Sequence, residues 1–325
     1  MMRFAPPLAC LACALAVSPT IAQKPAAEPI PEVKTIAFDS AAVGRTLKYN
    51  ISLPVDYDKS GDKRYPVLYL LHGLTSNYTD WAKLGAPKAA RGLDLIVVMA
   101  DGGNSWYVNW AESEDGQKNA WEDCIIQDLI GHVDANYRTI ARREGRAING
   151  LSMGGFGGIM LGLRHPDMFC SIGSQSGALT IPRMMADALN GKNSGILAFL
   201  KRSTNDNGNP EIGLEHFDSP AERTPNGTMF AKVEHAADHD PFQLVLKVPK
   251  KDLPHIYVDC GTEDFLIGGC REFARLLAEH NIPHVYAEST GGHSPQYWSR
   301  EIYTAVAVQY SILQRNLARA AGERP

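Results

Sequence analysis

The sequence predicts an α/β fold in which a mostly parallel sheet is covered by helices on both faces. Strand-like and helix-like segments alternate along most of the 325 residues, as expected when parallel strands are joined by helical crossovers. Residues 65–73 and 93–101 are almost continuously apolar, which is typical of strands buried on both faces. Between residues 118 and 137, large apolar side chains recur every four positions, and this spacing indicates an amphipathic helix.

The remaining elements are expected in a regular order. Two strands joined by a turn at Gly44 begin the domain and form an antiparallel edge. A strand, a helix stopped by Pro166 and another strand follow the helix at 118–137, and a strand, a helix, a strand and a long helix complete the chain. The corresponding ranges are 34–40, 45–54, 146–150, 153–165, 169–177, 254–264, 270–281, 283–290 and the segment from Pro295 onward.

Residues 178–250 interrupt this alternation. They are rich in Asn, Gly, Pro and charged residues, with short helical patterns at 182–190 and 194–201. Because their apolar content is too low for a separate core, we expect an insertion that lies over the C-terminal edge of the sheet, where such folds bind their ligands. Residues 35–317 are therefore predicted to form a single domain.

The N-terminus has the pattern of an export signal. One early Arg3 precedes a run of small and apolar residues, and a polar segment rich in Pro and Ala follows. This pattern predicts a signal peptide over residues 1–22, cleaved near Ala22, and a Pro-rich leader over 23–34. The apolar run is too short to span a membrane. A secreted or periplasmic protein is expected, and the alternative is a buried amphipathic N-terminal helix.

Charge and cysteine content exclude several classes of partner. The net charge is −4 with both signs interspersed, so neither nucleic acid nor an anionic membrane is an expected partner. No Cys/His cluster has metal-ligand spacing, and we expect neither a metal nor another cofactor. Export permits disulfides, so a Cys260–Cys270 bridge and four buried free thiols both remain open. The cysteines beyond the signal are Cys124, Cys170, Cys260 and Cys270.

Ser152 is the candidate nucleophile. It lies between Gly150 and Gly154, after a predicted strand and before a predicted helix. Gly-x-Ser-x-Gly in this context is typical of a serine on a sharp strand-to-helix turn, where neighbouring side chains would clash. The free amides at the start of the helix favour negative charge beside the serine.

A nucleophilic serine needs a base, and His293 is the best placed of the ten histidines. It follows the strand at 283–290 on a loop with two glycines, and catalytic groups of parallel sheets gather at the C-terminal ends of the strands. His72 also ends a strand, but it lies in a tight turn and is expected to shape that loop.

The orienting acid and the oxyanion hole complete the constellation. Asp264, in the loop after the strand at 254–264, is the first candidate for the acid, with Glu263 and Asp259 as competitors. It would accept the Nδ1 proton of the histidine and fix its tautomer. The amide after the nucleophile, that of Met153, and an amide in the turn after the strand at 65–73, that of Leu74, are the expected oxyanion donors.

Five segments together carry a resemblance: YPVLYLLHGLTSNYTDW, MADGGNSWYVNW, INGLSMGGFGG, CGTEDFL and GGHSPQYW. They resemble the esterase D family of α/β-hydrolases, which includes S-formylglutathione hydrolases, tributyrin-type, acetylxylan and feruloyl esterases, and antigen 85 mycolyltransferases. The resemblance runs from about residue 35 to 315 and implies the α/β-hydrolase fold without a large helical lid. It also implies Ser152 as nucleophile, Asp264 as acid and His293 as base. The oxyanion donors that it implies are the amides of Leu74 and Met153. Residues 178–250 match least well.

Three aromatic residues follow the second apolar strand. Trp106, Tyr107 and Trp110 either form an aromatic wall for a phenolic or sugar group or pack beneath the site loop. Trp298, five residues after His293, is expected in the core.

The expected function is therefore a secreted serine carboxylic ester hydrolase that forms an acyl-enzyme. Its expected substrates are short-chain acyl esters or feruloyl and acetyl esters of plant polysaccharide. The alternatives are a thioesterase similar to S-formylglutathione hydrolase, an acyltransferase of the antigen 85 type, and a binding module that has lost activity.

Overall fold

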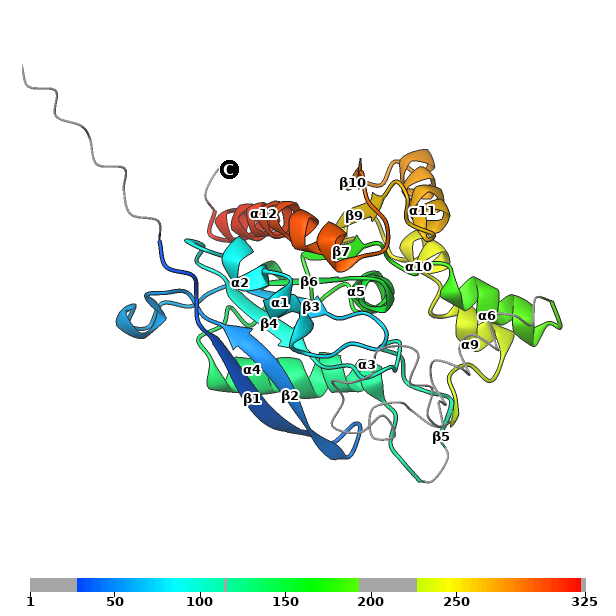
Figure 1. The fold of residues 1–325 in the computed structure, drawn as a ribbon, viewed down its shortest axis with the longest axis horizontal. Helices are drawn as coiled ribbons and strands as arrows, with labels where there is room; N and C mark the ends of the chain where they lie inside the picture. Colours follow the sequence, from blue (N-terminus) through cyan, green and yellow to red (C-terminus); the bar gives the residue numbers. More distant parts are fainter. Residues whose placement is uncertain (1–27, 114–115, 193–226, 323–325) are drawn as a thin grey trace, which may run out of the picture.

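The computed structural model describes residues 28–113, 116–192 and 227–322, which build one eight-stranded sheet and the helices around it (Figure 1). The predicted signal peptide at 1–22 and the helical pattern at 194–201 lie outside the described residues. The described helices include none that is both long and apolar enough to cross a membrane.

The sheet is mixed and mostly parallel, as predicted. The two leading strands pair with each other and with the next strand in antiparallel fashion, and every other neighbouring pair is parallel. The antiparallel edge expected from the turn at Gly44 is thereby confirmed. In spatial order the strands are β1 (Val33–Ser40), β2 (Arg45–Ser52), β4 (Ile96–Ala100), β3 (Val67–Leu71), β6 (Arg146–Gly150), β7 (Ser171–Gln175), β9 (His255–Gly261) and β10 (His284–Ser289).

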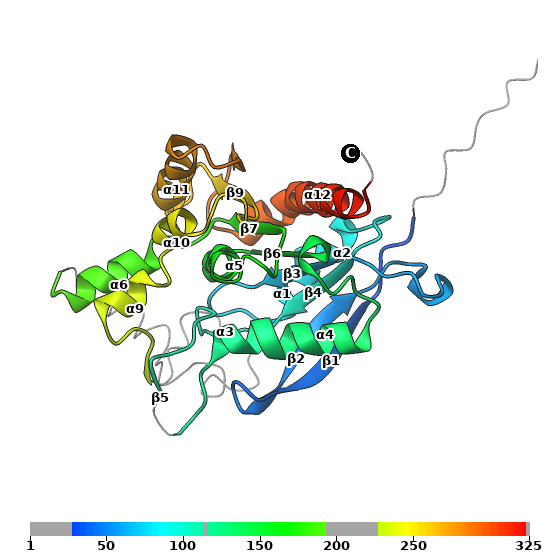
Figure 2. The ribbon, with the colours of Figure 1, turned by 180° about the vertical axis from the view of Figure 1, so that it is seen from behind.

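Helices cover both faces of the sheet, and α12 and α4 lie along opposite sides of it in Figures 1 and 2. One face packs against α1 (Asp80–Lys83), α2 (Ala86–Ala89) and α12 (Pro295–Ala320). The other packs against α3 (Trp121–Asp123), the π-helical turn η2 (Cys124–Leu129), α4 (Ile130–Asn136), α5 (Met153–Arg164), α10 (Pro241–Lys247) and α11 (Ile267–Glu279). Short 3₁₀ turns occur at η1 (Tyr57–Lys59) and η3 (Arg143–Gly145).

The strand β3 shows why its sequence is continuously apolar. Val67, Tyr69 and Leu71 belong to the core on the α4 and α5 side, whereas Leu68 and Leu70 belong to the core beneath α12. All five side chains are fully buried. Since successive residues of a strand point to opposite faces, a sheet covered on both sides needs apolar residues at every position of such a strand.

The helix predicted at 118–137 forms with one difference. Its middle turn, Cys124–Leu129, is a π-helix, which is wider than an α-helical turn. Trp121, Ile125, Leu129 and Val133 are nevertheless all buried on one side. A spacing of four on one face fits a helix whose period exceeds 3.6 residues.

The described parts of the 178–250 segment are anchored beside α5 and α11. They comprise α6 (Ile181–Leu189), β8 (Gly227–Thr228), which pairs with β5 (Glu112–Ser113), α9 (Val233–Ala237) and α10. The Arg183 guanidinium on α6 forms ion pairs with Asp240 at 3.1 Å and Glu272 at 2.7 Å. Because residues 193–226 are not described, the placement of this insertion over the sheet edge stays a prediction.

A buried carboxylate also ties this segment to the sheet-covering helices. Glu122 on α3 accepts hydrogen bonds from Arg164 at 2.9 Å and His165 at 2.7 Å, and His239 Nε2 lies 3.6 Å from it. Burial disfavours the charged form, but the hydrogen bonds from His165 and Arg164 and the nearby His239 imidazole outweigh burial and hold the pKa of Glu122 well below its usual range. Glu122 thus lies between His239, just after α9, and Arg164 at the end of α5.

A second buried carboxylate predicts a pH dependence of stability. Asp259 in β9 is 1% exposed, and burial raises its pKa to about 7 although Tyr297 donates a hydrogen bond to it at 3.0 Å. Between pH 4 and 7 the folded state therefore holds a proton that the unfolded state has lost. The free energy of unfolding contributed by this group should fall across that interval, by an amount on the order of a few kcal/mol, and stay flat above it.

Urea unfolding of the wild type and of Asp259→Asn at pH 5, 6, 7 and 8 measures this effect. The difference in unfolding free energy between the two proteins is expected to change with pH below 7 and to level off above it. A constant difference from pH 5 to 8 would contradict the assignment.

Candidate active site

Ser152 occupies a strained turn between β6 and α5. Its backbone angles are φ 54° and ψ −114°, which non-glycine residues rarely adopt. Its amide donates to the Gln175 carbonyl at 3.0 Å, and its carbonyl accepts the Ala178 amide at 3.1 Å. These two contacts hold the turn against the end of β7.

The glycines on either side of the turn are required by close packing. A Cβ atom at Gly154 would lie 2.2 Å from the Leu71 carbonyl oxygen, and one at Gly150 would lie 2.2 Å from the Gly154 carbonyl oxygen. Backbone atoms cannot yield to such contacts as a flexible side chain can. The spacing of the Gly-x-Ser-x-Gly motif thus has a steric explanation in this structure.

The structure brings Ser152, His293 and Asp264 together. The Ser152 Oγ lies 2.9 Å from His293 Nε2, and His293 Nδ1 lies 2.9 Å from Asp264 Oδ2. The three residues follow β6, β10 and β9, so the C-terminal ends of three parallel strands supply them, as expected for ligand sites of such sheets. The Asp264 side chain is fully buried, whereas His293 retains 18% exposure.

The environment of Asp264 keeps it ionised. Burial favours its neutral form, but hydrogen bonds from His293 and from the Leu266 amide at 2.9 Å outweigh burial and hold the pKa of this carboxyl below its usual value. An ionised carboxylate accepts a hydrogen bond from the Nδ1–H group, which leaves Nε2 as the acceptor toward the serine hydroxyl. The competing candidates lie elsewhere, since Glu263 is exposed and Asp259 is directed to Tyr297.

Both predicted oxyanion donors lie next to the serine. Leu74 lines the same pocket as Ser152, and a Cβ built at the preceding Gly73 would lie 3.4 Å from the Ser152 Cβ. Met153 is the first residue of α5, so its amide has no acceptor within the helix. Among the described residues, neither amide donates a backbone hydrogen bond. Leu74 and Met153 therefore both lie close to Ser152, and the role of their amides as oxyanion donors remains a prediction.

A pocket of about 390 Å³ opens beside the serine hydroxyl. Besides Ser152 and His293, its lining consists largely of the polar stretch that follows β3. Sequence reasoning missed this stretch because isolated hydroxyl, amide and charged residues in a loop carry no recognisable pattern. The residues lining the pocket are Gly73, Leu74, Thr75, Ser76, Asn77, Asp80, Lys83, Leu151, Ser152, His293 and Trp298.

Two further aromatic rings flank His293. The Trp298 ring stands edge-on to the imidazole with 4.9 Å between centroids, and it borders the pocket. Trp298 was expected in the core, and it is 9% exposed, so it belongs to both the core and the pocket wall. The Phe265 ring lies 4.7 Å from His293 and is 77% exposed. An exposed phenyl group beside the predicted base is a feature that the sequence did not reveal.

The predicted aromatic wall requires a correction. Tyr107 is fully buried and donates a hydrogen bond to the His72 carbonyl at 2.9 Å, so it cannot contact a substrate in the pocket. Trp106 is 3% exposed and packs on Phe156, and the Trp110 indole N–H donates to the Ser105 carbonyl. None of the three lines the pocket beside Ser152. The alternative, packing beneath the site loop, describes Trp106 and Tyr107, whereas Trp110 is half-buried.

The four cysteines of the described chain, which are Cys124, Cys170, Cys260 and Cys270, are buried free thiols. Of the two possibilities left open by the sequence, the bridge between Cys260 and Cys270 is therefore not formed. Burial raises the pKa of the Cys124 and Cys170 thiols to about 12, so neither is a thiolate at neutral pH.

Comparison with known protein sequences finds similarity to esterases. The family described as "Putative esterase" matches residues 40–308. An esterase of Mycobacterium tuberculosis is 32% identical over 260 residues, which cover 79% of this chain and 54% of that protein. The chain thus spans about half the length of this relative. An acetyl esterase of Caldicellulosiruptor saccharolyticus is 29% identical over 281 residues, covering 84% of this chain and 96% of the relative.

Solved structures share the fold. A fluorophosphonate-binding serine hydrolase of Staphylococcus aureus superimposes with a TM-score of 0.66 at 23% identity, covering 87% of this chain and 99% of the other. At this level of identity the likeness shows the architecture alone. It agrees with the mostly parallel sheet and the two helical layers described above.

Proposed function

This chain belongs to the esterase family, and from this premise we propose that it hydrolyses carboxylic esters with Ser152 as nucleophile, His293 as general base and Asp264 as orienting acid. The observation that carries the proposal is the chain of two 2.9 Å contacts from Asp264 Oδ2 through the imidazole to the Ser152 Oγ. Such a relay supplies what a serine hydroxyl lacks at neutral pH, a base within hydrogen-bonding reach.

Acylation follows from this geometry. The Ser152 Oγ attacks the ester carbonyl carbon while its proton passes to His293 Nε2, and the carbonyl oxygen becomes an oxyanion beside the amides of Leu74 and Met153. When the tetrahedral intermediate collapses, the bond to the alcohol oxygen breaks and His293 returns the proton to that oxygen. The acyl group is then held as an ester of Ser152, and the alcohol departs.

Deacylation repeats the sequence with water. His293 Nε2 takes a proton from the water molecule, whose oxygen attacks the acyl carbon, and then returns the proton to the Ser152 Oγ. Asp264 stays ionised throughout and stabilises the imidazolium that forms in each half-reaction. The products are a carboxylic acid and the regenerated hydroxyl.

The pocket supports an ester whose alcohol carries hydroxyl groups. The hydroxyls of Thr75 and Ser76, the amide of Asn77, the carboxylate of Asp80 and the ammonium of Lys83 supply both donors and acceptors in one short stretch. The Trp298 indole on the other side is suited to the apolar face of a sugar ring. We therefore include acetyl and feruloyl esters of polysaccharide, together with short-chain acyl esters, in the proposal. A relative of this chain is named an acetyl esterase.

Export to the periplasm or the medium is part of the proposal. It rests on the sequence of residues 1–22, with its early cation, its apolar run and its small residues before Ala22. N-terminal sequencing of the protein recovered from the producing cells tests it, since an intact Met1 would exclude cleavage.

A substrate panel tests the proposed specificity. Acetylated xylan, methyl ferulate, p-nitrophenyl acetate and a glutathione thioester are compared by kcat/KM. Lys83 is exposed at the pocket, with no ion pair among the described residues, so we expect Lys83→Ala to lower kcat/KM for acetylated xylan about tenfold. This is the usual effect of losing a hydrogen bond from a charged group. Hydrolysis of p-nitrophenyl acetate should change little.

Lys88→Ala is the matched control, because Lys88 is also exposed on a short helix but does not line the pocket. Equal losses in both variants, or a thioester hydrolysed faster than every oxygen ester, would argue against sugar-ester specificity. Absence of activity on all four substrates would reject the proposed function itself.

A further inference from the structure

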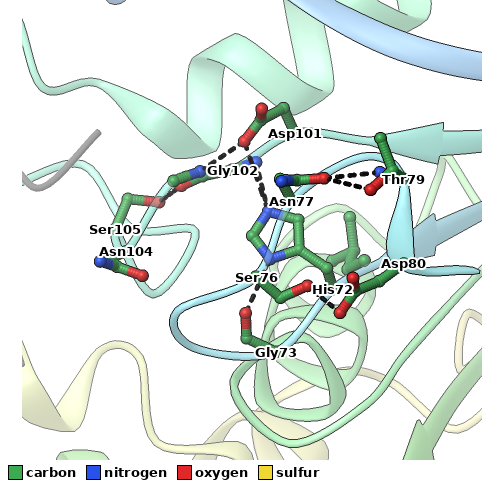
Figure 3. A network of polar contacts seen from close by, with 12 residues as sticks. His72, Gly73, Ser76, Asn77, Thr79, Asp80, Asp101, Gly102, Asn104 and Ser105 are labelled. Atoms are coloured by element: carbon green, nitrogen blue, oxygen red, sulfur yellow. Dashed lines mark hydrogen bonds and ion pairs between the residues drawn. The ribbon is translucent and has the colours of Figure 1, made fainter. Parts of the chain in front are cut away.

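The segment from Asp101 to Trp110, which does not line the pocket, contacts the loop that carries Leu74 (Figure 3). His72 lies at the centre of this contact, and its side chain is fully buried. Its Nε2 atom is 3.0 Å from the Gly102 amide nitrogen, and its Nδ1 atom is 2.7 Å from the Gly73 carbonyl oxygen. The imidazole therefore joins the loop after β3 to the loop after β4.

The partners of His72 determine its tautomer. The Gly102 amide is a donor, so Nε2 must accept and the ring proton must reside on Nδ1, from which it is donated to the Gly73 carbonyl. Asp101 Oδ1 lies 3.4 Å from Nε2, but it accepts the Gly103 amide at 2.9 Å. A proton on Nε2 would face the Gly102 N–H, so the neutral Nδ1–H form fits this site.

The direction of the Gly73 carbonyl determines the direction of the Leu74 amide. That carbonyl accepts from His72 Nδ1 and from the Ser76 amide at 3.3 Å. In a trans peptide the C=O and the N–H of the same unit point in opposite directions. The Leu74 N–H is therefore turned away from His72, and Leu74 and Ser152 line the same pocket.

The peptide units on both sides of this one are held by the segment after β4. The Tyr107 hydroxyl donates to the His72 carbonyl at 2.9 Å, and the Asn104 side-chain oxygen accepts the Thr75 amide at 2.8 Å. Thr75 has a left-handed φ of 66°, a conformation that costs free energy in a β-branched residue and needs such a contact to persist. The segment is itself braced, since the Ser105 hydroxyl donates to the Gly102 carbonyl and accepts the Tyr107 amide.

We propose that His72, Asn104 and Tyr107 are positioning residues that hold the Leu74 amide as an oxyanion donor. The proposal rests on the proposed function, because it needs an acyl-transfer reaction in which an oxyanion forms beside Ser152. A donor fixed before the reaction pays no reorganisation cost when charge develops, and the loss of a whole donor lowers kcat about a hundred- to a thousandfold. A donor that is kept but held less firmly should lower kcat by a smaller factor.

Asn104→Ala and Tyr107→Phe test the proposal. Each is expected to lower kcat for p-nitrophenyl acetate about ten- to a hundredfold with little change in KM, because the interaction lost is specific to the transition state. Asn104→Asp keeps an acceptor for the Thr75 amide and should restore most of kcat. Tyr69→Phe is the control, since Tyr69 is an equally buried tyrosine on the neighbouring strand β3.

A second readout separates positioning from general destabilisation. A trifluoromethyl ketone forms a hemiketal with the serine, and ¹⁹F NMR titration of this adduct reports the pKa of its oxyanion. With a well-placed donor this pKa is depressed, and we expect it to rise by about one unit in Asn104→Ala and Tyr107→Phe but not in Tyr69→Phe.

The outcomes distinguish this inference from the proposed function. If the wild type forms the hemiketal and neither variant changes its pKa or kcat, the positioning role is overturned while the esterase proposal stands. If kcat falls equally in Tyr69→Phe, the effect is one of packing and the inference also fails. If the wild type forms no hemiketal and hydrolyses no ester, the proposed function fails first.

Discussion

Replacing Ser152 with alanine is expected to lower kcat for ester hydrolysis by a factor of about 10⁴ or more without unfolding the protein. The hydroxyl is the only group at the turn that can form the acyl-enzyme, and without it the contact with His293 Nε2 at 2.9 Å is lost. An alanine methyl group fits the space that the serine Cβ already occupies, so the fold should persist. Initial rates with p-nitrophenyl acetate and the thermal unfolding temperature measure both expectations.

Ser171→Ala serves as the control for this substitution. Ser171 is a fully buried serine in β7, remote from the pocket, and its loss should leave kcat within a small factor of the wild type. Labelling by a fluorophosphonate probe should disappear in Ser152→Ala and persist in Ser171→Ala. Ester hydrolysis that survives in Ser152→Ala at more than a few per cent would require another nucleophile.

Replacing Asp264 with asparagine is expected to lower kcat about 10⁴-fold at neutral pH, because the amide would no longer hold the imidazole in the tautomer that accepts the serine proton. The carboxylate is fully buried and accepts a hydrogen bond from His293 Nδ1 at 2.9 Å. Since the hydrogen bonds to this carboxylate outweigh burial and lower its pKa, protonation of Asp264 in the wild type should reduce activity only at a pH below the usual titration range of an aspartate.

The neighbouring carboxylate provides the matched comparison. Glu263 is exposed and contacts the site through its backbone, whose amide donates to the Gly291 carbonyl. Glu263→Gln should therefore keep kcat within about threefold of the wild type across the pH profile, the usual scale for surface changes. A severe loss in Glu263→Gln combined with an active Asp264→Asn would exchange the two roles.

The order of elements was predictable because each carries a local signal. The alternation of helices and strands, the edge hairpin at Gly44 and the helix ending before Pro166 all follow from periodicity and from residues that break helices. The wider turn at Cys124–Leu129 was not predictable, since a spacing of four is shared by α- and π-helical turns. The placement of the domain ends and of the insertion over the site remains a prediction.

The candidate site was likewise predictable only in part. The proximity of Ser152, Asp264 and His293 was predictable because each follows a strand of the parallel sheet at its C-terminal end, which brings them to one edge. The sequence left two roles open for the aromatic residues at 106–110, because exposure depends on tertiary packing and flat rings suit a buried core as well as a substrate wall. Phe265 and the polar stretch from Thr75 to Lys83 were missed because their importance arises only from proximity to His293 and Ser152.

The free cysteines have a consequence for where this protein can mature. Its described framework is held by close packing and buried ion pairs, and none of its four cysteines is engaged in a covalent cross-link. Acquisition of this framework therefore requires no thiol-oxidising machinery. Folding of this described framework is therefore expected to proceed alike in a reducing and in an oxidising compartment.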